Sequence, residues 1–333
     1  MLLLGSSGVN RSVDLDQRRR RREEARRRTR RQRRVAIASV PLLAGAVLGG
    51  ALLLGGSGGD GPEAHSVRER EPAELPRGGR SILPERRVVA FYGAPQAREL
   101  GALGIGSPAQ AARRLERQAR PYARPGRPVL PAFELIATIV QSDPGEDGDH
   151  SVRQPDPTIR RYLRAARRRD MLLILDIQPG YAPFMREVRA LRRYLEEPDV
   201  SLALDPEWSL SPPVLPGQQI GSTSASVVNE VSAYVSRIVR EHRLPEKLLV
   251  VHRFTGDMIA DEDALRRHPG VALTVNVDGF GDRPNKRSKY REFTRGRRDR
   301  HHGLKLFYSE DTNLMQPRHV LGLRPPPELV VYE

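Results

Sequence analysis

From Arg87 onward, short apolar runs alternate with longer amphipathic stretches, and the apolar runs have the length of strands. We expect strands at residues 88–92, 129–135, 171–177, 200–205, 247–253, 271–277, 303–309 and 328–332. Strands at this spacing, with helices between them, predict an α/β fold of the (β/α)8 TIM-barrel type. A flavodoxin-like open sheet is the alternative, but in its small form it holds fewer strands.

Several connecting stretches carry helix signals. Ser107-Pro108 offers an N-cap followed by a first-turn proline, and Asp156-Pro157 repeats this arrangement. Pro183 opens a third amphipathic stretch, and residues 224–242 form a fourth. These stretches fit the helices that a barrel needs between its strands.

The helix signals are weaker in the later connections. A fifth helix around residues 261–268 looks short, and the sixth connection looks irregular. The sequence ends at Glu333, directly after the eighth expected strand, so a clear eighth helix is lacking.

Polar side chains close most of the apolar runs. A parallel barrel carries its reactive groups at the C-terminal ends of its strands, so these side chains are expected to share one mouth. Each acid alone could instead cap a helix or accept backbone N–H bonds. The candidate residues are Tyr92, Glu134, Asp176, Gln178, Asp205, Glu207, Trp208, His252, Asn276, Asp278, Glu310 and Asp311.

Strand parity sharpens this expectation, because side chains alternate between the two faces of a strand. Leu202 and Leu204 should face the helices, which turns Asp205 and Glu207 towards the barrel axis if the chain stays extended. The same alternation points polar residues of the first, second, third and sixth runs inward. The seventh run is ambiguous, since Glu310 shares the parity of its leucines.

Paired carboxylates across a cleft are suited to glycoside cleavage, one as proton donor and the other as nucleophile or base. On the segment Asp205-Pro206-Glu207-Trp208 and on Glu310 after the seventh run, residues 88–333 resemble, in a general way, extracytoplasmic (β/α)8 glycoside-hydrolase-like proteins of GC-rich, actinobacterial-type bacteria. The resemblance implies Glu207, Asp205 and Glu310 as catalytic carboxylates, with the other mouth residues binding substrate. The Asn-Glu pair common on the fourth strand of such enzymes is absent.

Two further chemistries remain open. Asp176, Asp205, Glu207 and Asp278 could bind Mg²⁺ or Ca²⁺, and His252 could join a transition metal. No closely spaced ligand motif supports a metal, so the sequence predicts neither metal nor cofactor. A non-catalytic barrel that binds envelope glycan is the alternative to the enzyme.

The formal net charge of +15 is concentrated at the N-terminus, where residues 1–34 hold thirteen arginines against four acids. The rest of the chain is far less basic, so nucleic acid is not an expected partner. The chain has no cysteine, which excludes disulfides and thiolate chemistry.

Residues 35–56 form an uncharged, largely apolar stretch of 22 residues that directly follows the arginine-rich segment. A helix of this length crosses a hydrocarbon core of about 30 Å. The positive-inside rule then places residues 1–34 in the cytoplasm and the C-terminal part outside a single-pass cell membrane anchor. A cleaved secretory signal is the alternative.

Two segments carry no predicted fold. Residues 57–86 are rich in Gly, Pro, Glu and Arg and are expected to be a disordered linker before a barrel domain at 87–333. Residues 283–300 are strongly basic and are expected to form a solvated irregular loop.

Overall fold

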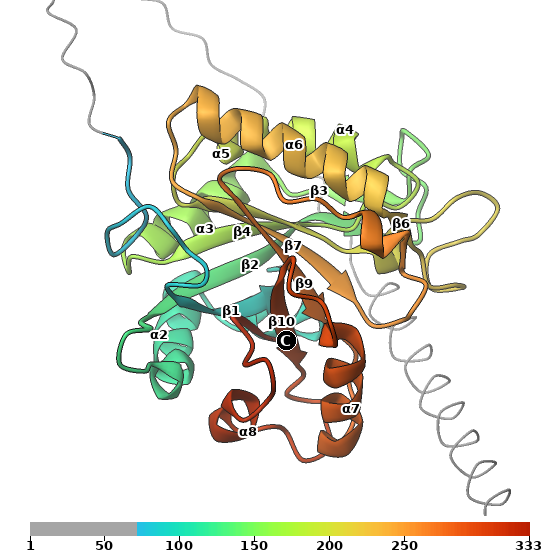
Figure 1. Cartoon of the computed structure of the whole chain (residues 1–333). Helices are drawn as coiled ribbons and strands as arrows, with labels where there is room; N and C mark the ends of the chain where they lie inside the picture. The colour runs from blue at the N-terminus through green and yellow to red at the C-terminus, as the bar shows by residue number, and fades with distance from the viewer. Residues whose placement is uncertain (1–71) are drawn as a thin grey trace, which may run out of the picture.

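The computed structural model describes residues 72–333. Its main feature is a ring of parallel strands in which each strand pairs with the next along the chain and the last pairs with the first (Figure 1). The strands are β1 (Arg87–Gly93), β2 (Val129–Val140), β4 (Leu172–Ile177), β5 (Val200–Leu204), β7 (Lys247–Arg253), β9 (Val271–Val277), β10 (His301–Leu306) and β11 (Leu329–Tyr332). The predicted eight-stranded barrel is confirmed, and the closure of β11 on β1 rules out the open sheet.

Helices occupy most of the connections. They are α2 (Pro108–Ala119), α3 (Asp156–Arg167), α4 (Phe184–Ala190), α5 (Arg192–Leu195), α6 (Ala225–Glu241), α7 (Arg283–Thr294) and α8 (Pro317–Leu321). Short strands β3 (Ser151–Arg153), β6 (Thr223–Ser224) and β8 (Ile259–Ala260) and 3-10 turns η1 (Arg98–Leu100), η2 (Ala102–Gly104), η3 (Arg120–Tyr122), η4 (Pro206–Trp208) and η5 (Glu262–Ala264) complete the described elements.

The helix starts follow local chemistry. Ser107 caps α2 in a full capping box with Gln110, as its position before Pro108 predicts. Asp156 lies inside the first turn of α3 rather than at its cap, and Pro155 precedes it. The Asp156 carboxylate accepts a hydrogen bond of 2.8 Å from the Tyr194 hydroxyl, so it ties α3 to α5 instead of closing the helix end.

The apolar side chains divide into two layers, as strand alternation requires. Leu202 and Leu204 pack with the helices outside the barrel, whereas Ala203 belongs to the cluster that fills the barrel interior. The interior cluster is made largely of strand residues such as Val88, Leu130 and Ile174, so the barrel is a packed core and not a pore.

The N-terminal end of the barrel is closed by residues that precede β1. Leu75, Ile82 and Leu83 are buried in the interior cluster, although the sequence predicts a linker through residue 86. The Glu246 carboxylate accepts hydrogen bonds from the backbone N–H groups of Ile82 (2.6 Å) and Leu83 (2.9 Å). The ordered domain therefore starts before β1; three apolar residues among many polar ones give too weak a signal to predict this.

Two of the later connections differ from expectation. The basic segment begins with the helix α7, not an irregular loop: Asp282 accepts the N-cap hydrogen bond from Asn285, and Tyr290 and Phe293 are buried against the core. The fifth connection carries the short strand β8 and the 3-10 turn η5 in place of the expected short helix.

Among residues 72–333, no helix has the length and apolar character needed to cross a membrane. The predicted anchor at 35–56, the cytoplasmic tail at 1–34 and the first part of the linker lie outside the described residues.

Candidate functional site

A pocket opens at the C-terminal ends of the barrel strands. Its cavity volume is about 100 Å³, which is smaller than the roughly 300–1,000 Å³ of most small-ligand sites, so it would hold only part of a larger ligand. Its walls combine apolar side chains with a convergent group of polar ones. Its polar and aromatic lining residues are Tyr92, Glu99, Gln178, Asp205, Glu207, Trp208, Asp278, Lys305, Phe307 and Glu333.

One wall of the pocket comes from the turn that follows β5. Pro206 starts η4 directly after Asp205, so the chain does not stay extended as the parity argument required. The turn nevertheless brings Asp205, Glu207 and Trp208 to the pocket together. It is fixed by backbone hydrogen bonds from Asp205 N–H to Ile177 (3.0 Å) and from Gly221 N–H to Glu207 (2.7 Å).

Tyr92, at the end of β1, connects the pocket to the buried interior. Its hydroxyl donates a hydrogen bond of 3.0 Å to Oδ2 of Asp176 on β4 and accepts one of 3.0 Å from Gln178 Nε2. The Gln178 amide oxygen in turn accepts from the backbone N–H of Val140 (3.2 Å). The sequence predicted all three side chains at the mouth, and the structure joins them in one hydrogen-bonded chain.

His252, on β7, lies between two carboxylates inside the barrel. Its Nε2 is 2.9 Å from Glu134 Oε1, and its Nδ1 is 3.1 Å from Asp278 Oδ2. The Asn276 amide lies 3.3 Å from the same Nδ1. Side chains from β2, β7 and β9 therefore meet although they are far apart in sequence.

Lys305 is a site residue that sequence reasoning missed. Its Nζ lies 3.2 Å from Asp278 Oδ2, 2.7 Å from Glu333 Oε2 and 3.6 Å from the centroid of the Tyr92 ring. A signal was present: Leu304 and Leu306 face the helices, so alternation turns Lys305 inward. Glu333 was also missed, although it directly follows β11 and closes the eighth apolar run as the predicted acids close theirs.

The barrel interior shifts the pKa values of Asp176 and Asp278 in opposite directions. Burial, followed by the repulsion of the Asp205 carboxylate, raises the pKa of Asp176 to about 8, so this carboxyl is protonated at neutral pH. Burial also acts to raise the pKa of Asp278, but the Lys305 ammonium and the His252 imidazole outweigh it and hold that pKa well below its usual range. At neutral pH, Asp176 is therefore neutral and Asp278 is ionised, although both lie in the same barrel.

The basic groups complement the ionised acids. Burial alone would lower the pKa of His252, but the Glu134 carboxylate and the hydrogen bonds to Asp278 and Glu134 raise it well above its usual value. The pKa of Lys305 is likewise raised, since Asp278 and Glu333 outweigh the effect of burial. His252 and Lys305 are therefore cations that balance buried carboxylates.

Two predicted residues lie elsewhere. Glu310 is exposed on the turn after β10 and does not line the pocket. Asp311 is buried, but its carboxylate accepts backbone hydrogen bonds from Phe307 (3.0 Å) and Gly281 (2.9 Å) and pairs with Lys286. Asp311 therefore anchors the loop after β10.

Comparison with known proteins adds no family to this description. The chain matches no protein-family model and no curated protein. The site itself consists of a pocket with Asp205, Glu207 and Trp208 on one wall, next to a buried network of paired charges.

Proposed function

We propose that the protein is a membrane-anchored, extracytoplasmic barrel enzyme that cleaves glycosidic bonds in a cell-envelope glycan. The single observation that carries the proposal is that Asp205, Glu207 and Trp208 wall the same pocket at the barrel mouth. Carboxyl groups beside an aromatic ring provide what glycoside cleavage needs: a proton donor, a negative charge opposite the developing oxocarbenium ion, and a surface for a sugar ring.

The roles follow from position. Glu207 is the proposed general acid, since its longer side chain lies on the pocket wall next to Trp208. Asp205 is the proposed partner carboxylate in place of Glu310, because Asp205 lines the pocket and Glu310 does not. The Asp205 carboxylate also contributes to raising the pKa of Asp176 and of Lys305, so it lies near the buried network.

The other pocket residues would orient the substrate. Gln178, Lys305 and Asp278 offer hydrogen-bonding groups to hydroxyls, and their own contacts hold them in place. Because Lys305 and Asp278 form an ion pair, they supply directional polar contacts with little net charge. A site held by such contacts is preorganised for a polar ligand.

The extracytoplasmic location rests on sequence. The apolar stretch at residues 35–56 follows twelve arginines between Arg18 and Arg34, which favours an anchor with the barrel outside. The envelope glycan is the polymer that a barrel in this location would meet.

A second function is a barrel that binds glycan without turnover. It is favoured by the pairing of Asp278 and Glu134 with Lys305 and His252, which removes two of the predicted mouth acids from proton transfer. The test is to incubate the purified full chain with envelope polysaccharides and to measure both release of new reducing ends and retention on the insoluble polymer. Release of reducing ends supports the enzyme, and retention without release supports the binding protein. If the protein neither releases reducing ends nor binds the polymer, both functions are refuted.

A further inference from the structure

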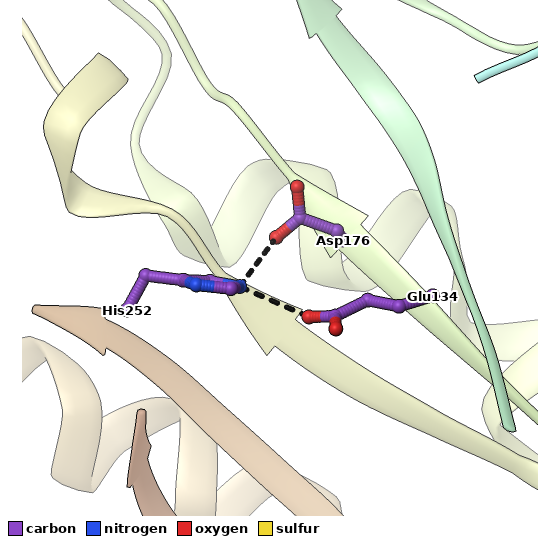
Figure 2. A group of neighbouring side chains, drawn as sticks. All are labelled: Glu134, Asp176 and His252. Carbon is purple, nitrogen blue, oxygen red and sulfur yellow. Dashed lines mark hydrogen bonds and ion pairs between the residues drawn. The ribbon is translucent and has the colours of Figure 1, made fainter. Parts of the chain in front are cut away.

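A cluster of three side chains lies beneath the pocket and is not used by the proposed cleavage. Glu134 on β2, Asp176 on β4 and His252 on β7 each offer one ligand atom, and these atoms lie within 4.8 Å of one another. Figure 2 shows the two carboxyl groups pointing towards the same edge of the imidazole ring. All three side chains are buried, so what they bind must lie inside the barrel.

The cluster is incompletely satisfied. Among the described residues, Glu134 Oε2 and Asp176 Oδ1 are buried oxygens that have no hydrogen-bond partner. A buried acceptor without a partner destabilises a fold by about 1–3 kcal/mol, and buried polar groups are normally paired with protein, ordered water or an ion. Asp176 Oδ1 lies 3.8 Å from His252 Nε2, and a cation between these two atoms would satisfy this oxygen. Glu134 turns its other oxygen, Oε1, towards the same nitrogen at 2.9 Å, so both carboxyl groups face Nε2.

We propose that Glu134, Asp176 and His252 bind one divalent transition-metal ion of the Zn²⁺ type. Metal–nitrogen and metal–oxygen bonds of about 2.0–2.2 Å in a tetrahedral arrangement place ligand atoms about 3.4 Å apart. The separation of Nε2 from Glu134 Oε1 is 2.9 Å and from Asp176 Oδ1 is 3.8 Å, so the two distances fall on either side of that value. Small side-chain rotations that move these ligand atoms by a few tenths of an ångström would bring both distances to about 3.4 Å.

The ligand set selects the class of ion. Imidazole suits Zn²⁺ and similar transition ions, whereas Mg²⁺ and Ca²⁺ prefer six or more oxygen ligands, often including water. Three protein ligands with a fourth position left for water also match a zinc site that is not closed by protein alone.

The surrounding contacts hold each ligand in a binding orientation. Asp278 Oδ2 accepts from His252 Nδ1, which leaves Nε2 as the metal-facing nitrogen. The Tyr92 hydroxyl donates to Asp176 Oδ2 and leaves Oδ1 available. Coordination requires the unprotonated nitrogen and the ionised carboxylates, so the ion replaces the protons held on His252 Nε2 and on Asp176 and releases them to solvent.

The site is tested by direct binding, with no activity measurement. The purified full chain is treated with a chelator, dialysed against Zn²⁺, and its bound metal is counted, with Mg²⁺ and Ca²⁺ in parallel. We expect one Zn²⁺ per chain and no stoichiometric Mg²⁺ or Ca²⁺. Zn²⁺ should also raise the midpoint of thermal unfolding, because it binds the folded state.

Variants locate the ion. Glu134→Gln and Asp176→Asn should weaken Zn²⁺ binding at least tenfold, whereas Glu99→Gln, on an exposed glutamate of the pocket rim, should leave it unchanged. Absence of bound Zn²⁺ in the wild type overturns the proposal, and so does binding that both cluster variants retain.

Co²⁺ provides a readout that does not depend on the variants' folding. Loaded into the wild type, it should give the intense visible absorption of a four-coordinate site. A weak octahedral spectrum would place the ion outside this cluster and overturn the assignment. Each of these results is independent of glycan cleavage, which can succeed or fail separately.

Discussion

Lys305 Nζ and Asp278 Oδ2 lie 3.2 Å apart inside the barrel, and both side chains are almost completely buried. The ion pair joins β10 to the end of β9, next to the pocket. Removing one member leaves the other as a buried charge without its main partner, which destabilises proteins by about 3–5 kcal/mol.

Lys305→Met should therefore lower the free energy of unfolding by about 3–5 kcal/mol, since it keeps the volume and removes the cation. Lys289→Met is the matched control: Lys289 is only partly buried, 5.9 Å from the Phe254 ring, and its loss should change stability by less than about 1 kcal/mol. Urea unfolding at pH 7 measures both. Equal effects of the two substitutions would show that the buried pair has no special role.

Asp176 gives the stability a defined pH dependence. Its folded-state pKa of about 8 exceeds the unfolded value of about 3.9, so the folded state binds a proton that the unfolded state releases. Stability is therefore lost as pH rises between these values, by at most about 4 kcal/mol from pH 5 to pH 8. Asp176→Asn, which resembles the protonated form, should remove most of this loss.

The raised pKa of His252 acts in the same direction but starts higher. Its contribution is fully present below about pH 6.5 and declines above it, so the variant should retain a decline only in the upper part of the range. Unfolding is measured from pH 5 to pH 8.5 with a chelator present. A wild type and an Asp176→Asn protein with the same pH profile would contradict the assigned protonation state.

Gly303 and Gly256 form a second matched pair. A Cβ at Gly303 would lie 2.4 Å from Asn276 Oδ1, whereas one at Gly256 meets nothing within 4 Å. Gly303→Ala should therefore destabilise the barrel by about 1–3 kcal/mol, and Gly256→Ala should be close to neutral. Thermal unfolding of the two variants distinguishes them, and a harmless Gly303→Ala would mean that the Asn276 side chain is free to move.

The membrane topology predicts protease access. If residues 35–56 span the membrane with the barrel outside, protease added to intact spheroplasts should degrade the segment 61–333 while a cytoplasmic marker protein survives. Degradation only after lysis would place the barrel in the cytoplasm and remove the envelope glycan as its substrate.

The sequence predicted the barrel well because each strand is a run of buried apolar residues with a regular spacing. It also predicted that Asp176, Asp205 and Asp278 would converge, since parity and strand-end position are local properties. Lys305 was missed because a buried lysine depends on partners from other strands, Asp278 and Glu333, that only closure brings together. The charge states could not be predicted, because they arise from burial and from neighbours that are distant in sequence.

The segments in which the structure differs from the sequence prediction have weak local signals for their secondary structure. The helix α7 has few apolar residues, so its basic sequence resembled a loop, although Asp282 and Pro284 mark its start. Glu310 shares the parity of outward-facing leucines, and the turn after β10 leaves it exposed.

The measurement that tests the central claim most directly compares Glu207→Gln with Glu310→Gln. The wild type and both variants are incubated with the polysaccharide that the wild type degrades best, and the rate of reducing-end release is measured. Glu207→Gln should lose at least a hundredfold in rate, because it keeps the shape of the side chain and removes the proton donor, while Glu310→Gln should retain the wild-type rate. Full activity in Glu207→Gln would contradict a pocket in which Glu207 is the general acid.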